Sequence, residues 1–245
     1  MGRENNIDRY LDAIMEQGLF SSRGNLRFHM ETLFKGIDIE NKRVLDIGGG
    51  VGLYSFYAAC SGAENVLCLE PEAKGSSSGV ADTFHRLNEI LTLDNVEFEP
   101  TTIQALETGG ETFDIILLHN SINHLDETAC IDLLEDPESR AIYKEIFSKI
   151  YSIASEGAKL VVCDCSRYNF FAKLGIKNPF GPTIEWHKHQ APETWAELLS
   201  EVGFTDPTIR WSSLNIFRSW GRALFGNRLI AYFTTSHFCL VMNRD

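Results

Sequence analysis

Hydrophobic residues recur at helical spacing near the start of the chain. The apolar positions 7, 10, 11, 14 and 15 fall at i, i+3, i+4, i+7 and i+8, which predicts an amphipathic helix. A second set, Leu26, Met30, Leu33 and Phe34, predicts another helix. No strand-like run precedes residue 43, so we expect residues 1–42 to form a separate helical segment.

Beyond residue 42, apolar runs of strand length alternate with helical patterns. The run "FDIILL" is uninterrupted, as expected for a strand that is buried on both faces of a parallel sheet. We expect seven strands, at 43–47, 65–70, 96–99, 113–118, 159–165, 207–211 and 238–242. The alternation predicts an α/β fold with a doubly wound, mostly parallel, seven-stranded sheet over residues 43–245.

Capping residues mark the ends of the predicted helices. A helix over 53–61 is closed by Gly62, and another follows at 80–91. The longest begins with Asp136 as N-cap and Pro137 as its first residue, and we expect it to end at Gly157. Two segments interrupt the alternation, the insertions 166–191 and 212–236, and both follow late strands.

Composition and charge narrow the functional classes. The chain has 245 residues and a net charge of −12, which argues against a nucleic-acid partner because phosphate binding needs a basic footprint. The first ten residues are polar, and no apolar run approaches the roughly 20 residues of a membrane span, so we expect a cytoplasmic protein. The six cysteines lack CxxC spacing, and we expect buried free thiols.

Four glycines follow the first predicted strand in "VLDIGGGVG", residues 44–52. A cluster of this kind indicates a backbone that bends sharply or approaches a ligand closely. A dinucleotide fingerprint would need its third glycine at position 53, which is Leu53. The sequence therefore disfavours a nicotinamide oxidoreductase and leaves the pattern D-x-G-x-G-x-G.

This pattern resembles motif I of the class I S-adenosylmethionine-dependent methyltransferases, and the resemblance covers about residues 43–165 and 192–242. It implies a Rossmann-like methyltransferase fold in which Asp46 accepts from the ammonium group of S-adenosylmethionine and Glu70 from its ribose hydroxyls. Thr102 stands where the family often has Asp at the adenine site. The resemblance implies these cofactor-binding residues: Asp46, Gly48, Gly49, Gly50, Gly52, Glu70, Thr102, Ile103, His119 and Asn120. It also implies that the N-terminal helices cover the site as a lid.

Polar side chains gather after the fourth strand, in "HNSINHLDE". Transfer of a methyl group to a hydroxyl needs a base to accept the proton, and His124 and His119 are the candidate catalytic residues. The alternative for His124 is a side chain that only packs beside the cofactor. A second alternative is that these histidines share a Mg²⁺ ion with Asp126 and Glu127, although the spacing matches no known ligand motif.

The two insertions are the candidate substrate-binding segments. The first contains aromatic, amide and basic side chains, and we expect Asn169, Trp186, His187 and His189 to contact the substrate, the alternative being an ordinary surface excursion. The stretch 211–237 has arginines but no acidic residue. It either packs on the N-terminal helices, which we favour, or contacts anionic lipid or a lipid-linked substrate.

These observations favour a methyltransferase that acts at oxygen on a small molecule or saccharide. An anionic acceptor, such as a sugar with a carboxylate or phosphate, suits the basic C-terminal part. The alternatives are N-methylation of a small amine and a cofactor-binding module without catalysis. The sequence leaves the acceptor and the oligomeric state undetermined.

Overall fold

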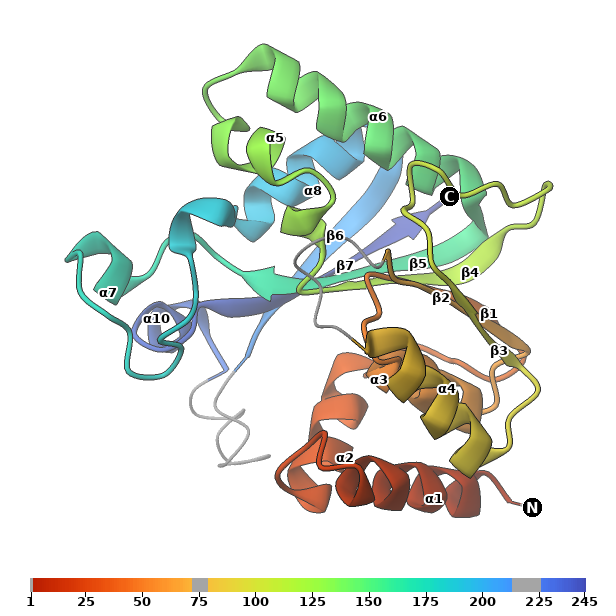
Figure 1. The fold of residues 1–245 in the computed structure, drawn as a ribbon. Helices are drawn as coiled ribbons and strands as arrows, with labels where there is room; N and C mark the ends of the chain where they lie inside the picture. The colour runs from red at the N-terminus through yellow and green to blue at the C-terminus, as the bar shows by residue number, and fades with distance from the viewer. Residues whose placement is uncertain (1, 72–78, 213–225) are drawn as a thin grey trace. The chain divides into compact units, whose positions relative to one another are not determined.

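A computed structural model gives the fold of residues 2–71, 79–212 and 226–245 (Figure 1). The chain forms two compact units. Unit 1 comprises Met1–Leu118 and Ile153–Lys159, and unit 2 comprises His119–Ser152 and Leu160–Asp245. Among the described residues, no helix is long and apolar enough to cross a membrane.

Unit 1 contains the first four helices and the first four strands. In chain order these are α1 (Arg3–Glu16), α2 (Arg23–Leu33), β1 (Arg43–Ile47), α3 (Leu53–Cys60), β2 (Asn65–Leu69), α4 (Val80–Leu91), β3 (Val96–Glu99) and β4 (Phe113–His119). Strand β1 pairs in parallel with β2 and β4, and β2 pairs in parallel with β3. In this register Ile47 lies beside Leu69, and Asp46 beside both Cys68 and Leu117.

Unit 2 contains the later elements. They are η1 (Ile122–His124), α5 (Glu127–Asp132), α6 (Pro137–Ile153), the carboxyl-terminal half of β5 (Ala154–Cys165), α7 (Phe170–Lys173), η2 (Trp186–Lys188), α8 (Pro192–Glu201), β6 (Phe204–Trp211), α10 (Arg228–Tyr232) and β7 (His237–Arg244). Strands β6 and β7 are antiparallel. The strands follow the order β3-β2-β1-β4-β5-β7-β6, which confirms the predicted α/β fold with its mostly parallel seven-stranded sheet.

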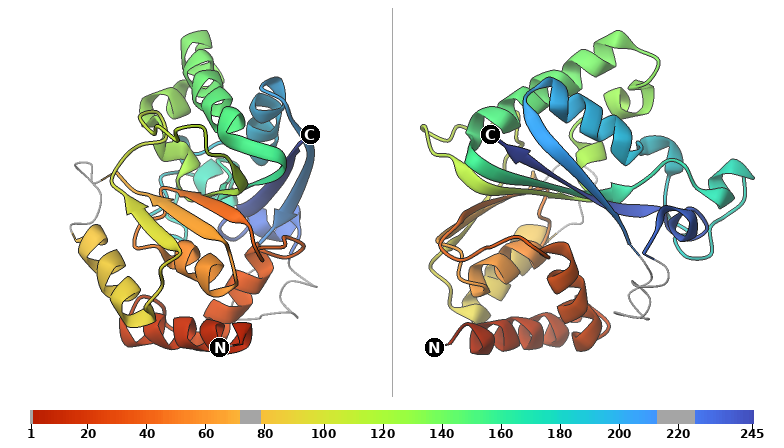
Figure 2. Two further views of the ribbon diagram at one scale, coloured as in Figure 1. Left: turned by 90° about the vertical axis from the view of Figure 1, so that its right-hand side faces the viewer. Right: turned by 180° about the vertical axis from the view of Figure 1, so that it is seen from behind.

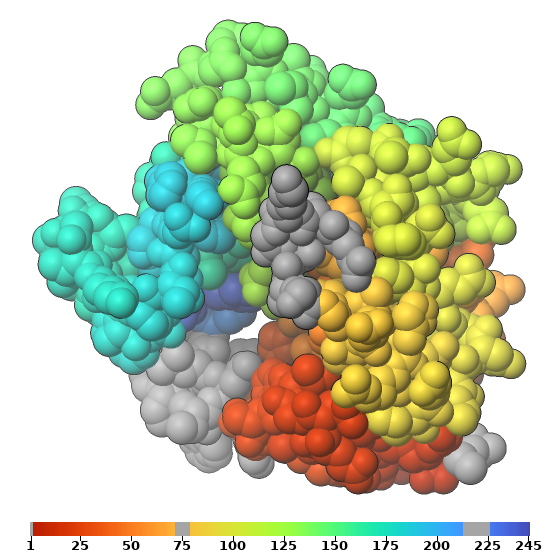
Figure 3. All heavy atoms as spheres, in the orientation of Figure 1, coloured from red at the N-terminus to blue at the C-terminus, as the bar shows by residue number. Residues whose placement is uncertain are grey.

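The predicted N-terminal helices belong to the core of unit 1. Helices α1–α4 lie on one face of strands β1–β3 (Figure 2). Helix α1 packs against both α3 and α4, and Figure 3 shows the N-terminal helices (red) against α4 (gold). The apolar face of α1 predicted by its spacing is fully buried at Tyr10, Leu11 and Ile14. The action of these helices as a lid stays a prediction.

The junction of α6 and β5 differs from the sequence prediction. Asp136 caps α6 as expected, because its Oδ2 accepts from the Ser139 backbone N–H at 2.9 Å. The helix ends at Ile153, however, and β5 begins at Ala154. The hydroxyl of Ser155 donates to the Phe113 carbonyl and to Asp114 Oδ1, at 3.1 and 2.7 Å, and so ties the extended chain to the start of β4. Gly157, with φ +76°, therefore lies inside a strand.

Trp195 of α8 is the largest fully buried side chain of unit 2 and packs against Tyr143 and Phe147 of α6, with ring centroids 5.1 and 5.9 Å apart. Its indole Nε1 has no hydrogen-bond partner among the described residues. We expect Trp195→Ala to lower the free energy of unfolding by about 3–5 kcal/mol through the cavity it leaves. Trp195→Phe keeps most of the packing and removes the unpaired donor, so we expect a much smaller loss. Urea unfolding of both variants tests this, and equal losses would contradict it.

Candidate functional site

The glycine run after β1 forms a tight turn beside the end of β2. The backbone N–H groups of Gly48 and Gly49 both donate to the Leu69 carbonyl oxygen, at 2.8 and 3.1 Å, and Gly52 N–H donates to Gly49 O at 3.0 Å. Gly48, Gly50 and Gly52 have φ of 70°, 54° and 81°, a region that side chains disfavour. The turn therefore favours glycine at alternate positions, 48, 50 and 52, which are the glycines of the D-x-G-x-G-x-G pattern.

Close packing explains two of the glycines, and a third faces open space. A Cβ on Gly49 would lie 2.5 Å from Cys68 Sγ and 2.8 Å from Asp46 Oδ2, and one on Gly52 would lie 2.5 Å from the ring of Phe84. A Cβ on Gly50 would meet no atom of the described residues within 4 Å. The Gly50 side of the turn is thus the side that a ligand can approach.

Asp46 is a buried carboxylate with one oxygen unused. Ser55 Oγ donates to Asp46 Oδ2 at 2.7 Å, whereas Oδ1 has no hydrogen-bond partner among the described residues. Burial raises the pKa of Asp46 to about 6, with a smaller contribution from the Glu70 charge, while the Ser55 hydrogen bond opposes the rise. A buried carboxylate oxygen without a donor favours binding of a cationic donor, so this site fits an ammonium group.

Glu70 follows β2 and reaches the same turn. Its Oε2 accepts from the Gly50 backbone N–H at 2.9 Å, while Oε1 has no partner among the described residues. Thr102 and Ile103 lie in the segment that follows β3. The Thr102 hydroxyl accepts weakly from Ala105 N–H at 3.3 Å, and the Ile103 side chain is buried. The predicted cofactor residues that precede β4 in the sequence therefore all lie in unit 1, at or just after the carboxyl ends of the parallel strands β1, β2 and β3. Ligands of open α/β sheets bind at this end of the strands.

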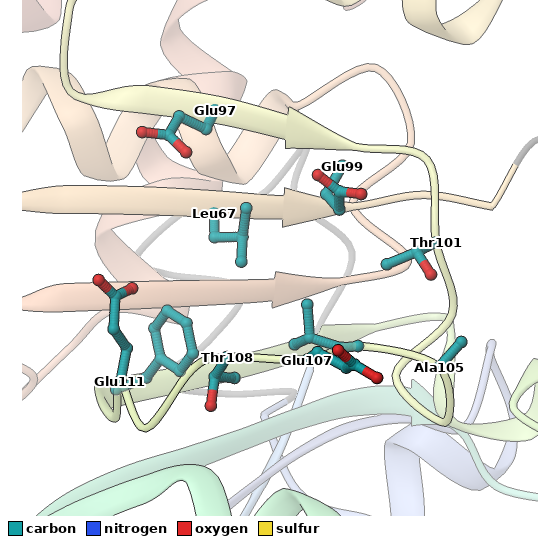
Figure 4. A pocket seen from close by; sticks show the side chains of 10 residues that line it. Leu67, Glu97, Glu99, Thr101, Ala105, Glu107, Thr108 and Glu111 are labelled. Atoms are coloured by element: carbon teal, nitrogen blue, oxygen red, sulfur yellow. The ribbon is translucent and has the colours of Figure 1, made fainter.

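Unit 1 also contains a cavity of about 410 Å³ that the sequence analysis did not predict (Figure 4). Its lining consists of Leu67, Glu97, Glu99, Thr101, Ala105, Leu106, Glu107, Thr108, Glu111 and Phe113. None of the predicted cofactor residues lines it. The alternation V-E-F-E in β3 is the signal that could have indicated one acidic face of a strand.

In unit 2, polar side chains meet at the carboxyl end of β5 and the start of β7. Asn120, in the left-handed region with φ 54°, donates its N–H to the Cys163 carbonyl at 2.7 Å. Its Oδ1 lies 3.3 Å from His237 Nε2, and the rings of His119 and His237 are 5.6 Å apart. Desolvation of the ring lowers the pKa of His237.

A second carboxylate with an unused oxygen lies in this group. Asp164 is fully buried in β5, and its Oδ1 accepts from the Cys165 N–H at 2.7 Å and lies 3.0 Å from His189 Nδ1. Asp164 Oδ2 has no partner among the described residues. The sequence predicted that His189 contacts the substrate, but it gave no indication of a role for Asp164.

The other predicted catalytic and substrate residues have different surroundings. The side chain of His124 is 54% exposed, and its Nδ1 lies 2.6 Å from Glu127 Oε1. The hydrogen bonds from His124 and Lys188 lower the pKa of Glu127. His187 is exposed and Trp186 half-buried. The described residues contain no group of three or more His, Cys, Asp or Glu side chains that could hold a metal ion, so the Mg²⁺ alternative gains no support.

Asn169 is buried within unit 2. Its amide donates to the carbonyl oxygens of Tyr232 and Thr234, at 3.1 and 2.8 Å, and so holds the start of the first insertion to the segment before β7. In the second insertion, Arg228 lies 3.0 Å from Glu193 of α8. The described part of this insertion thus pairs with an acid of unit 2, and Arg218 and Arg222 lie outside the described residues.

Comparison with known proteins identifies the family. The family model described as "Methyltransferase domain" matches residues 21–209. The chain belongs to this methyltransferase family. A curated relative, the ubiquinone biosynthesis O-methyltransferase of Cereibacter sphaeroides, is 29% identical over 207 residues, which are 82% of this chain and 74% of the relative.

Solved structures of methyltransferases share the fold. A SAM-dependent methyltransferase from Aquifex aeolicus is similar with a TM-score of 0.59 and 15% identity, over 94% of this chain and 96% of the other. A protein from Thermotoga maritima, described as a possible histamine N-methyltransferase, gives a TM-score of 0.56 and 17% identity, over 98% and 99% of the two chains. The protein is therefore an S-adenosylmethionine-dependent methyltransferase, and the predicted family is confirmed.

The two central glycines of the turn provide a matched pair of variants. Gly49→Ala places a methyl group against Asp46 and Cys68, and we expect it to lower the free energy of unfolding by about 1–3 kcal/mol. Gly50→Ala meets no atom of the described residues and adds only the backbone strain of a left-handed alanine, about 1 kcal/mol. We expect Gly50→Ala to weaken binding of S-adenosylhomocysteine at least tenfold in calorimetric titration. Unchanged affinity in this variant would show that the open side of the turn is not the ligand side.

Proposed function

We propose that the protein transfers the methyl group of S-adenosylmethionine to a hydroxyl oxygen of a small molecule. The observation that carries the cofactor part is the buried Asp46 Oδ1, which lacks a donor beside a turn whose Gly50 side is open. The curated relative's name, an O-methyltransferase, supports oxygen as the target. Bound S-adenosylmethionine supplies an electrophilic methyl group on a positively charged sulfur.

The residues of unit 1 would hold the cofactor by its polar ends. Asp46 Oδ1 would accept from the ammonium group of its methionyl part, and Glu70 Oε1 from a ribose hydroxyl while Oε2 stays on Gly50 N–H. The backbone at Thr102 and Ile103 is the candidate adenine contact, because no aspartate stands there. His119, the last residue of β4, and Asn120, which follows it, stay the candidates beside the methyl group.

The acceptor is proposed to be a small hydroxylated molecule with a negative charge. Residues 166–184 of unit 2 contain Arg167, Lys173 and Lys177 but no acidic residue, which favours an anionic group on the acceptor. Aromatic side chains of the same segment, such as Phe171 and Phe180 with ring centroids 6.4 Å apart, offer flat apolar contact. N-methylation of a small amine is the second candidate, since the Thermotoga maritima protein with this fold is described as a possible histamine N-methyltransferase.

Cofactor affinity should depend on pH through Asp46. The pKa of Asp46 is raised to about 6 in the ligand-free protein, and only the ionised carboxylate can pair with an ammonium group. We therefore expect the affinity for S-adenosylhomocysteine to be constant above about pH 7 and to fall by up to tenfold per pH unit below about 6. Ser55→Ala removes a hydrogen bond that lowers this pKa, so its midpoint should move to higher pH. Calorimetric titration from pH 5 to 8 measures both, and a flat wild-type profile would contradict the assignment.

A panel of acceptors tests the proposed reaction. Catechol, 3,4-dihydroxybenzoate, glucuronate and histamine are each incubated with the protein and S-adenosylmethionine labelled in its methyl group. We expect labelled methyl ethers, with 3,4-dihydroxybenzoate preferred over neutral catechol, and no transfer by Asp46→Ala. Transfer to histamine alone would establish the amine alternative, and equal use of the charged and neutral catechols would remove the argument for an anionic acceptor.

A further inference from the structure

We propose that His189, oriented by Asp164, is the general base that accepts the proton of the acceptor hydroxyl. This inference rests on the proposed O-methylation, and it assigns the base to a residue pair outside the loop that follows β4. His189 lies between η2 and α8, and Asp164 is the second-last residue of β5 (Figure 1).

The burial of Asp164 is the first argument. It stands in the apolar run of β5, between Cys163 and Cys165, and is fully buried. An ionised carboxylate in such surroundings is costly unless charged or hydrogen-bonding groups face it. His189 and a single backbone N–H are its partners among the described residues, and Oδ2 has none. Packing alone would be served better by an apolar side chain at this position, so the acid points to a function.

The hydrogen bond determines which nitrogen of His189 can act. With Asp164 ionised, Nδ1 carries the proton and donates to Oδ1 at 3.0 Å. The lone pair of the neutral ring then lies on Nε2, whereas the side-chain hydrogen bond found for His189 among the described residues is made by Nδ1. The side chain is 13% exposed, so the ring is held but not sealed from solvent. This is the arrangement in which a carboxylate fixes the tautomer of a catalytic histidine.

The charged group in direct contact with the His189 ring is the carboxylate of Asp164. The carboxylate of Asp164 stabilises the imidazolium, and the neighbouring His237 has a lowered pKa and stays neutral, so it adds no opposing charge. Burial raises the pKa values of the nearby Cys130 and Cys165 thiols, which stay protonated. Among the basic residues near this group, Arg167 donates from Nη1 to Gln190 Oε1 at 3.1 Å, and Arg210 acts on the neighbouring Cys163.

The alternative base, His124, has a carboxylate partner that is exposed to solvent. Its partner Glu127 has a side chain 44% exposed and is shared with Lys188, whose Nζ lies 3.3 Å from Oε2. Exposed pairs are weak and screened by salt.

The proton balance of the step is simple. The acceptor hydroxyl gives its proton to His189 Nε2, and the oxygen keeps the electron pair of the O–H bond for its new bond to the methyl carbon. The bond between the methyl carbon and sulfur would break with its electron pair left on sulfur, which would give neutral S-adenosylhomocysteine. The imidazolium of His189 would then release its proton to water.

Nuclear magnetic resonance of the ¹⁵N-histidine-labelled protein tests the tautomer without any turnover. We expect His189 of the wild type to show a proton on Nδ1 and a bare Nε2 at neutral pH. In Asp164→Asn the amide can donate to Nδ1, so the proton should move to Nε2. A wild-type signal with the proton on Nε2 would overturn the proposal.

Kinetics on two hydroxyl probes completes the test. With catechol, we expect His189→Gln and Asp164→Asn to lower kcat by about 10²–10⁴-fold, with unchanged affinity for S-adenosylhomocysteine. With 4-nitrocatechol, whose hydroxyl ionises far more readily, the loss should be much smaller, because the base is then dispensable. The exposed His85→Gln is the matched control and should keep its activity.

Two results separate the failure of this inference from that of the proposed function. Methylation of hydroxyls that is unaffected by His189→Gln, or lost in His124→Gln instead, would overturn the base while leaving O-methylation intact. Methylation of histamine alone would overturn O-methylation and with it the role of His189 as a hydroxyl base, whatever tautomer the spectra show.

Discussion

The buried carboxylate of Asp46 is the constraint on which the glycine turn of unit 1 depends. One oxygen is held by Ser55 of α3, and the side chain is so close to the turn that position 49 tolerates no Cβ. The same turn is held by the Leu69 carbonyl, which accepts two N–H groups, and by Glu70. Strands β1 and β2 and helix α3 thus converge on one carboxylate whose remaining oxygen has no donor among the described residues.

The helices of unit 1 support this turn from behind. Gly52 packs against Phe56 and Phe84, whose ring centroids are 4.6 Å apart, and these rings fill the space between α3 and α4. Tyr10 of α1 is fully buried and donates its hydroxyl to the Leu53 carbonyl at 3.0 Å, in the first turn of α3. Helix α1 therefore fixes the position of the helix that directly follows the glycine turn. Rigid support of this kind keeps a binding site preorganised.

Local signals predicted most of the fold, and they are also the basis of the proposed cofactor site. Strands β1 and β3 and helix α4 have the predicted bounds because apolar spacing alone decides them. The motif residues Asp46 and Glu70 were found because they adjoin strands in the sequence. The predicted end of α6 at Gly157 was wrong. The helix ends earlier because Ser155 forms hydrogen bonds to β4 that hold the chain in an extended conformation. The pair of Asp164 and His189 was missed because it joins residues that only the fold of unit 2 brings together.

The two histidine–carboxylate pairs of unit 2 show why spacing along the chain is a poor guide to electrostatics. His124 and Glu127 are three residues apart beside one short helix, which made them visible in the sequence and also leaves them in solvent. Such a pair contributes about 0–1 kcal/mol, because water and salt screen both charges. Asp164 and His189 come from a strand and a distant loop, and that non-local origin is what allows the strand to bury the acid completely. Low polarity strengthens the interaction of the carboxylate with an imidazolium and leaves few competing partners. The pair that depends on the tertiary fold is thus the one that is shielded from solvent.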